Sequence, residues 1–429
     1  MPAVHSHARL IGIAADDVTG ATDSAVQFSR SGWISRLMLD TAQADQLEAG
    51  SAVAVSSDAR PMEALSAQAT TVEAVESLMK RGVDRLYLKI DSTMRGSVAD
   101  QLKGALAAWR KYHPAGFAVV CPSYPAMGRT MENGTLWVHG LPLTDSPAGR
   151  DPVTPVTTNE MAELLPGTRI ITLSDTSPVI NAGLLKEAAA EGVVAVNAAS
   201  DAELRVLADA IAAAGPMAVP AGSAGLAAAM SEAWLATSEA LEVQPPTQPA
   251  KRIVVVVSSV HDVAKAQTAH LRARLAPADL LVLQPDADLF AVWEDLDSWT
   301  SGQLAATETL PKVVIILPPE GGPLLQLTGA AVARRVAAVV RRAMGQGNFD
   351  ALVLVGGDGA HAVLDALGAL ALRVTGAIQE GIPRGVIEGG SAAGKVVVTK
   401  AGGFGEASAL LETVNELTKH IALPTEAYS

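Results

Sequence analysis

Short apolar runs alternate with segments of helical spacing along most of the chain. The runs at 253–257 and 313–317 are apolar throughout, which is typical of strands buried on both faces of a parallel sheet. Between such runs lie segments such as 62–81 and 98–112, where apolar residues recur at helical spacing. This alternation predicts an α/β fold with mainly parallel sheets.

The predicted elements fall into two series. In the first half of the chain the expected strands are Arg9–Ala14, Ser51–Ser56, Arg85–Ile90, Gly116–Cys121, Arg169–Thr172, Val193–Asn197 and Ala218–Pro220. In the second half they are Arg252–Ser258, Val313–Leu317, Ala351–Val355 and Lys395–Thr399, with helices expected at Ala264–Leu275, Gly329–Met344 and His361–Leu370.

A proline-rich stretch separates the two series. Pro245, Pro246 and Pro249 lie within five positions and prevent a continuous helix or central strand. The sequence therefore predicts an N-terminal domain over residues 1–241, a linker over 242–252 and a C-terminal domain over 253–429.

Residues 122–160 interrupt the strand–helix rhythm. Proline, glycine, threonine and asparagine dominate there, and a loop of this length inside a compact domain is usually functional. Its charged side chains fit a lid and a partner surface equally well. These charged residues are Arg129, Glu132, Asp145, Arg150 and Asp151.

Composition narrows the class of protein. The 429 residues are 49% hydrophobic but only 3% aromatic, which suits Ala- and Val-rich α/β domains. The formal net charge of −13 argues against a nucleic-acid or anionic-membrane partner. The single cysteine, Cys121, excludes an internal disulfide and is expected to be a buried structural thiol. With no signal peptide or membrane-length apolar run, a cytoplasmic protein is expected, and a homodimer is allowed by the sequence.

Two polar motifs follow predicted strands of the first domain. Asp16 and Asp17 end the first strand and precede a helix expected at Ala21–Ser31. Ligands in open α/β sheets collect at the carboxyl ends of strands, so these carboxylates are candidates to bind or deprotonate a substrate hydroxyl. The alternative is helix capping alone, because aspartate is a favoured N-cap residue.

The second motif mixes both signs of charge. Lys89 lies on an otherwise apolar strand, and Asp91, Ser92 and Arg95 follow within a few residues. A buried ammonium requires an anionic partner, either a substrate carboxylate or an internal salt bridge of Lys89 with Asp91 or Asp16. Arg95 and, at a third strand end, Arg60 are further candidate ligands of an anion.

Two glycine turns and one serine-containing turn follow predicted strands of the second domain. They are Gly356-Gly357-Asp358-Gly359, Lys400-Ala401-Gly402-Gly403-Phe404-Gly405 and the hydroxyl-bearing Ser258-Ser259-Val260-His261. Backbone amides at such a turn, together with a helix N-terminus, form a phosphate site, whereas a tight turn without a ligand is the alternative. His261 is expected at the start of a helix rather than as a base. Neither a Walker A loop nor a complete dinucleotide fingerprint is present, and no metal site is recognisable.

Taken together these motifs resemble the four-carbon acid sugar kinase family, whose members phosphorylate threonate, erythronate or 3-oxo-tetronate. The matching stretches are Ala15–Ala21, Lys89–Gly96, Pro220–Leu226, Gly356–Asp358 and Lys400–Gly405, in the order of the family. The resemblance implies an acid-sugar domain, an ATP domain and a reaction in the cleft between them, with Mg²⁺ as cofactor.

The resemblance also implies roles for individual residues. The catalytic carboxylate would be Asp16 or Asp17. The substrate contacts would be Arg60, Lys89, Ile90, Asp91 and Ser92. Independently of the resemblance, the charge of Arg95 makes it a further candidate to clamp the substrate carboxylate. The nucleotide contacts would be Ser258, Gly356, Gly357, Asp358, Gly359 and Gly403.

This chain departs from the family pattern at two nucleotide positions. Gly359 stands where the family commonly has threonine, and His261 departs from the usual serine. The alternatives to a kinase are a non-catalytic sensor of sugar acids and nucleotides, and a dinucleotide-dependent dehydrogenase. The missing fingerprint counts against the dehydrogenase.

Overall fold

The computed structural model divides the chain into two compact units, Met1–Val243 and Gln244–Ser429. It describes residues 9–39, 50–151, 153–174, 177–235, 249–307, 310–320, 327–346 and 349–418, without the side chains of Glu294 and Asp358. Most of the predicted linker lies outside the described residues. No helix among the described residues is long and apolar enough to cross a membrane.

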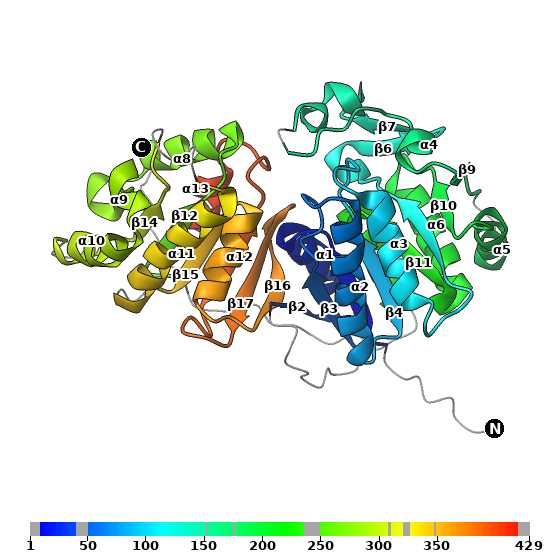
Figure 1. Ribbon diagram of the computed structural model, residues 1–429, viewed down its shortest axis with the longest axis horizontal. Coiled ribbons are helices and arrows are strands. Elements are labelled where there is room, and N and C mark those ends of the chain that lie inside the picture. The colour runs from blue at the N-terminus through cyan, green and yellow to red at the C-terminus, as the bar shows by residue number, and fades with distance from the viewer. Residues whose placement is uncertain are drawn as a thin grey trace, which may run out of the picture. The chain divides into compact units, whose positions relative to one another are not determined.

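Unit 1 contains a parallel sheet of eight strands in the order β2-β3-β1-β4-β11-β5-β10-β9 (Figure 1). The bounds are β1 Ile11–Ala15, β2 Ile34–Met38, β3 Ser51–Ser56, β4 Arg85–Lys89, β5 Phe117–Cys121, β9 Arg169–Ile171, β10 Val193–Val196 and β11 Ala218–Gly222. Strand β1 pairs in parallel with both β3 and β4, and all five of its residues are buried. The carboxyl ends of β1, β3 and β4 therefore lie side by side.

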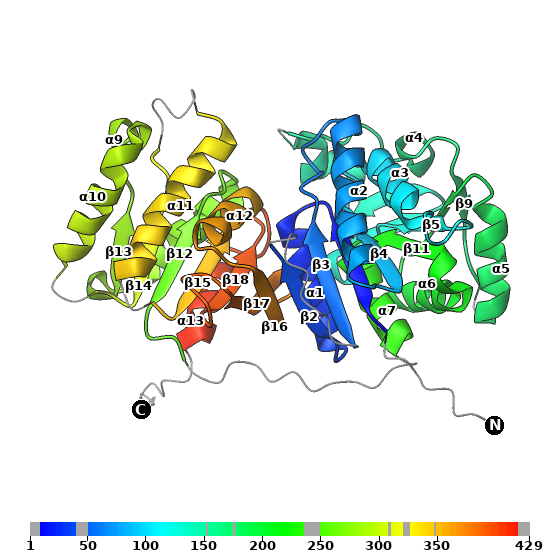
Figure 2. The ribbon, with the colours of Figure 1, turned by 60° about the horizontal axis from the view of Figure 1, so that its bottom comes forward.

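Helices cover both faces of this sheet, as Figure 2 shows from a second angle. On one face lie α1 Val18–Arg30, α5 Pro178–Ala188, α6 Asp201–Ala214 and α7 Ala224–Leu235, and on the other lie α2 Ala64–Lys80 and α3 Val98–Trp109. The short helix α4, Met161–Leu164, precedes β9. Under α1 and α7 the largest aromatic residues pack together, with Phe28 in contact with Trp33, Tyr87 and Trp234.

Unit 2 contains a second sheet in the order β13-β14-β12-β15-β18-β17-β16. Its first five strands are parallel: β12 Ile253–Val257, β13 Leu280–Leu283, β14 Val313–Ile316, β15 Ala351–Val355 and β18 Val396–Lys400. The last two, β16 Ala371–Gln379 and β17 Ile382–Glu388, are antiparallel. The predicted α/β class with mainly parallel sheets is thus confirmed.

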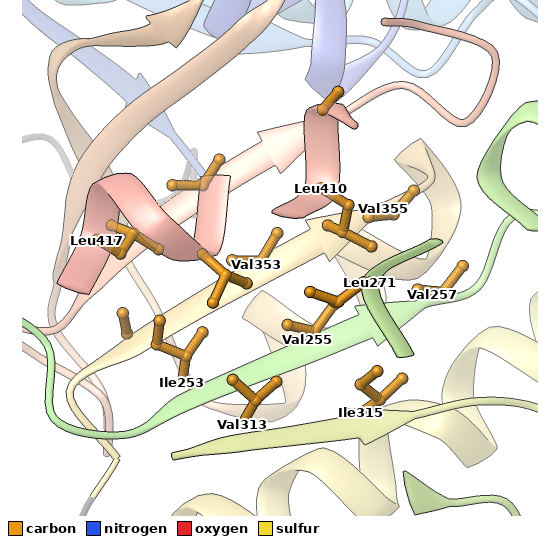
Figure 3. Close-up of a cluster of buried hydrophobic side chains, with 14 of the residues drawn as sticks. Ile253, Val255, Val257, Leu271, Val313, Ile315, Val353, Val355, Leu410 and Leu417 are labelled. Atoms are coloured by element: carbon orange, nitrogen blue, oxygen red, sulfur yellow. The ribbon is translucent and has the colours of Figure 1, made fainter. Parts of the chain in front are cut away.

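The core of unit 2 follows from the strictly apolar strands. Ile253, Val255 and Val257 of β12 face helices α8 Asp262–Arg274 and α13 Ala409–Thr418, and pack against Leu271 and Leu410 (Figure 3). The opposite face is covered by α10 Trp293–Ala305, α11 Gly329–Gln346 and α12 Gly357–Ala366, and α9 Ala287–Ala291 precedes α10. Both faces are covered, which explains why the strand carries no polar residue.

The sequence reading missed four strands and misread one segment. Strands β2, β13, β16 and β17 were not expected, because β2, β16 and β17 mix polar and apolar residues and β13 is an edge strand of four residues. Residues 122–160 are not a structureless loop: they form a three-stranded antiparallel sheet of β6 Arg129–Glu132, β7 Thr135–Val138 and β8 Leu141–Pro142. Its strands are too short to give a clear alternation of apolar and polar residues.

The close packing of α2 against α3 yields a stability prediction. A Cβ at Gly104 of α3 would collide with the carbonyl oxygen of Gln68, whereas a Cβ at Gly183 of α5 would meet nothing within 4 Å. We expect Gly104→Ala to destabilise unit 1 by about 2 kcal/mol despite the better helix propensity of alanine. The matched control Gly183→Ala should stabilise it by up to about 1 kcal/mol. Urea unfolding of both variants measures this, and equal shifts would contradict it.

Candidate functional sites in the two units

Three adjacent strand ends of unit 1 bring the predicted acid-binding residues together. Asp16 and Asp17 follow β1, Arg60 lies beyond β3, and Asp91 follows β4. Backbone hydrogen bonds fix these loops to one another: the amide of Asp16 donates to Lys89 O at 3.2 Å, and the amide of Arg60 donates to Asp16 O at 3.2 Å. The predicted convergence of these side chains is therefore present in the structure.

Arg60 lies at the centre of this cluster. Its Nε and Nη2 each donate to the carboxylate of Asp16 at 2.8 Å, its Nη1 lies 2.6 Å from Asp17 Oδ2, and its Nη2 lies 3.7 Å from Asp91 Oδ2. One guanidinium thus faces three carboxylates. The sequence offers Lys89 as a partner of Asp16 or Asp91, whereas in the structure Asp16 pairs with Arg60, and Asp91 pairs with Arg95 at 2.7 Å and lies 3.7 Å from Arg60.

Burial and these ion pairs set the charge of the cluster. Burial raises the pKa of Asp16, although Arg60 and Lys89 act to lower it. Burial would also raise the pKa of Asp91, but Arg95 and Arg60 hold it well below its usual range. Asp91 is therefore ionised at neutral pH, whereas Asp16 needs the positive charge of Arg60 beside it to stay ionised.

Asp17 caps a helix and also keeps some exposure. It is the N-cap of α1, and its Oδ1 accepts a hydrogen bond from the amide of Gly20. Its side chain is 23% exposed, whereas that of Asp16 is fully buried. A Cβ at Gly20 would lie 2.7 Å from Asp17 Oδ1 and 2.9 Å from Lys89 Nζ, which explains why a glycine occupies this first turn.

The loop after β4 carries the remaining acid-site candidates. Lys89 is buried and its Nζ donates to Ile90 O at 2.8 Å, while the Ile90 side chain itself is fully buried. Ser92 is partly exposed. Thr93, which the sequence reading did not single out, donates to Asp91 Oδ1 through its amide and its hydroxyl.

Arg95 is held on two sides. Its Nε and Nη2 donate to Asp91 at 3.1 and 2.7 Å, and its Nη1 donates to Asp151 Oδ2 at 2.8 Å. Gly96, with φ +82°, lets the loop approach closely, since a Cβ there would lie 2.5 Å from Arg60 O. Nothing in the local sequence links Asp151 to Arg95, so the sequence predicts only that Asp151 is one of the charged residues within 122–160.

In unit 2 the predicted nucleotide residues converge in the same manner. Strand β15 lies between β12 and β18, so Ser258, Gly356 and Lys400 end three neighbouring strands. The amide of Ser258 donates to Val355 O at 3.0 Å and that of Gly356 to Lys400 O at 2.9 Å. Helix α12 begins at Gly357, so the amides of Gly357 and Gly359 belong to its first turn, where no intrahelical acceptor exists.

The serines after β12 occupy the space beside these glycines. A Cβ at Gly359 would collide with the Ser258 side chain, and a Cβ at Gly402 would collide with that of Ser259. A Cβ at Gly403 would lie 3.0 Å from His261 Nε2. Gly359 thus replaces the threonine of the family pattern at a position where the Ser258 hydroxyl already fills the space.

Two other sequence expectations are settled in the structure. His261 is the N-cap of α8, and its Nδ1 accepts from the amide of Val263 at 3.2 Å, as expected of a residue at a helix start. Cys121 is a free, buried thiol, and burial raises its pKa to about 11. The side chain of Asp358 lies outside the described structure.

Removing Arg60 should destabilise unit 1, because Arg60 balances the charge of the buried carboxylates. We expect Arg60→Met to destabilise unit 1 by about 3 kcal/mol, because it leaves Asp16 charged and buried. Protonation relieves that cost: the pKa of Asp16 is raised in the folded state, so the loss should be larger at pH 8 than at pH 5. Thermal unfolding at both pH values measures it. Lys103→Met, which removes an exposed pair with Asp100, is the control and should cost less than about 1 kcal/mol.

Comparison with known proteins agrees with this division. Residues 11–230 match the family model of a sugar-binding N-terminal domain, and residues 254–410 match that of a nucleotide-binding C-terminal domain. A D-threonate kinase of Bordetella bronchiseptica is 38% identical over 95% of this chain and 97% of its own. A 3-oxo-tetronate kinase of Brucella melitensis is 27% identical over 88% and 89%.

A solved structure from Salmonella typhimurium LT2 matches the fold with a TM-score of 0.76 at 22% identity, over 95% of this chain and 99% of that one. The two domain models and the relatives align along nearly the whole chain. On this evidence the chain belongs to the family of four-carbon acid sugar kinases.

Proposed function

We propose that this protein transfers the γ-phosphoryl group of ATP to a hydroxyl of a four-carbon sugar acid, with D-threonate as the first candidate. The proposal rests on the observation that the ionic side chains and the glycine turns lie in different units. The cluster around Arg60 falls within the sugar-binding domain, and the glycine turns fall within the nucleotide-binding domain. D-threonate comes first because the Bordetella relative, at 38% identity, is named for it.

We assign the contact with the attacking hydroxyl to Asp17 rather than Asp16. Both oxygens of Asp16 accept from Arg60 and its side chain has no exposure, so Asp16 is less accessible to a substrate hydroxyl than Asp17 is. Asp17 is 23% exposed and lies against the same guanidinium. Asp16 then holds Arg60 in place, and Asp17 orients or deprotonates the acceptor hydroxyl.

Lys89 is our principal candidate for the substrate carboxylate. An ammonium has three donors, and Ile90 O takes one of them. Arg60 and Arg95 add positive charge, but their donors already serve protein carboxylates. In this proposal the partly exposed Ser92 binds a substrate hydroxyl, and Ile90 and Asp91 shape the loop.

The nucleotide is assigned to the strand ends of unit 2. The proposed contacts are Ser258, Gly356, Gly357, Asp358, Gly359 and Gly403. The first-turn amides of α12 and the positive end of the helix suit a polyphosphate. The described residues hold no group of three or more His, Cys, Asp or Glu side chains that could bind a metal ion, so we propose that Mg²⁺ is carried by the phosphates of ATP. Bound there, Mg²⁺ neutralises phosphate charge, and the rest of catalysis is positioning.

The direct test is release of ADP from Mg-ATP with a panel of acids: D- and L-threonate, D- and L-erythronate and 3-oxo-tetronates. We expect turnover with one of them, D-threonate first. The double variant Asp16→Asn/Asp17→Asn should lose turnover by at least about a hundredfold, while its ATP affinity stays unchanged. Asparagine at position 17 still caps α1, so the start of the helix is kept in the variant. Silence of the wild type across the panel, with ATP still bound, would contradict the proposal.

Lys400 gives a pH-dependent prediction for the nucleotide. It is buried at the end of β18, its Nζ donates to Ala401 O at 2.8 Å, and burial lowers its pKa to about 8. A phosphate nearby would favour the ammonium and raise that pKa again. ATP binding should therefore take up a fraction of a proton near pH 8, and ATP affinity should fall as pH rises through this range. Calorimetry in two buffers of different ionisation enthalpy measures the uptake. Equal uptake by Lys400→Met would refute it.

A further inference from the structure

The segment that holds the small sheet of β6, β7 and β8 runs from residue 122 to Asp151 and crosses the carboxyl edge of the unit 1 sheet. Near β10, the small sheet is fixed by a bridge between Met131 and Ala198 and by the amide of Gly134, which donates to Asn197 Oδ1 at 2.9 Å. At its other end, Asp151 reaches the loop after β4 through its 2.8 Å contact with Arg95. The segment is thus anchored at two separate strand ends.

The Asp151 carboxylate is fixed from two directions. Its Oδ1 accepts from the amides of Val153 and Thr154 at 3.0 and 2.9 Å, and its Oδ2 accepts from Arg95 Nη1. Its side chain is only 18% exposed. Burial opposes its charge, but the two amides and Arg95 lower its pKa, so the carboxylate is ionised at neutral pH. The turn thus binds Oδ1, and Oδ2 accepts from Arg95.

Arg95 transmits this restraint to the acid cluster. Its other two donors form a bidentate pair with Asp91, whose side chain is 8% exposed and faces Arg60 as well. Arg129 of β6 is near enough that Asp91 and Arg95 both influence its pKa, which burial lowers. Asp151, Arg95, Asp91 and Arg60 therefore alternate in the sign of their charge, and each lies next to the following one.

We propose that Asp151 is a positioning residue for the sugar-acid site: by holding Nη1 of Arg95 it fixes the Arg95–Asp91 pair and joins the small sheet of β6, β7 and β8 to the acid cluster. This inference rests on the proposed function of that cluster. Asp151 acts through Arg95 and does not touch the substrate. The effect is on binding of the acid and leaves the nucleotide site in unit 2 unchanged.

The test is Asp151→Asn, which keeps an oxygen for the Val153 and Thr154 amides and removes the charge that faces Arg95. We expect KM for the four-carbon acid to rise roughly tenfold, with KM for ATP unchanged and kcat altered less than about threefold. The matched control is Asp145→Asn, an exposed acid of the same segment, which should match the wild type. An unchanged KM for the acid in Asp151→Asn would overturn the inference.

A double-variant cycle separates positioning from a general loss of structure. If Asp151 acts through Arg95, Asp151→Asn should have no further effect on KM in an Arg95→Gln background, whereas independent effects that multiply would overturn the inference. Hydrogen exchange gives a readout that does not need activity: Asp151→Asn should speed exchange of residues 91–97, and unchanged exchange would overturn the inference. A wild type inactive on every acid would instead refute the proposed function, while the exchange result would still decide the role of Asp151.

Discussion

Charge compensation by Arg60 is the interaction on which the strand-end cluster of unit 1 depends. The loops after β1 and β4 bring three carboxylates to one place, the loop after β3 brings Arg60, and Asp16 is fully buried there. Without a cation between them, these groups would repel one another and bear the cost of lost hydration. A guanidinium suits the position because its planar donors can pair with Asp16 at one edge and reach Asp17 and Asp91 with the same group.

The two units use one structural device for two kinds of chemistry. In each, the central strand ends between two parallel neighbours, so three loops from distant parts of the sequence meet at a single edge. In unit 1 these loops carry ionic side chains that pair with one another. In unit 2 they carry mainly small residues, with backbone amides and hydroxyls, and Lys400 at the end of β18 adds one cation. Loops made of small residues suit a ligand that carries its own charge, because backbone amides can then approach it closely.

The sequence allowed the fold class and the strand ends to be predicted because both are local properties. Apolar runs identify the buried strands, and the polar residues that follow them mark the sheet edge, so the gathering of Asp16, Arg60 and Asp91 could be anticipated. The pairing inside the cluster could not be. Lys89 is as plausible a partner for Asp16 by sequence as Arg60 is, yet Arg60 forms the ion pair from 44 residues away, and Asp151 joins Arg95 from 56 residues away. Such choices depend on loop geometry that only the folded chain sets.

The space shared by Ser258 and Gly359 links two loops that are far apart in the chain. The serine side chain fills the volume that any side chain at 359 would need. A side chain at position 359 would therefore require Ser258 to change rotamer or to be replaced by a smaller residue. The size of the residue at 359, on α12, is in this way set by a residue about a hundred positions earlier in the chain, directly after β12.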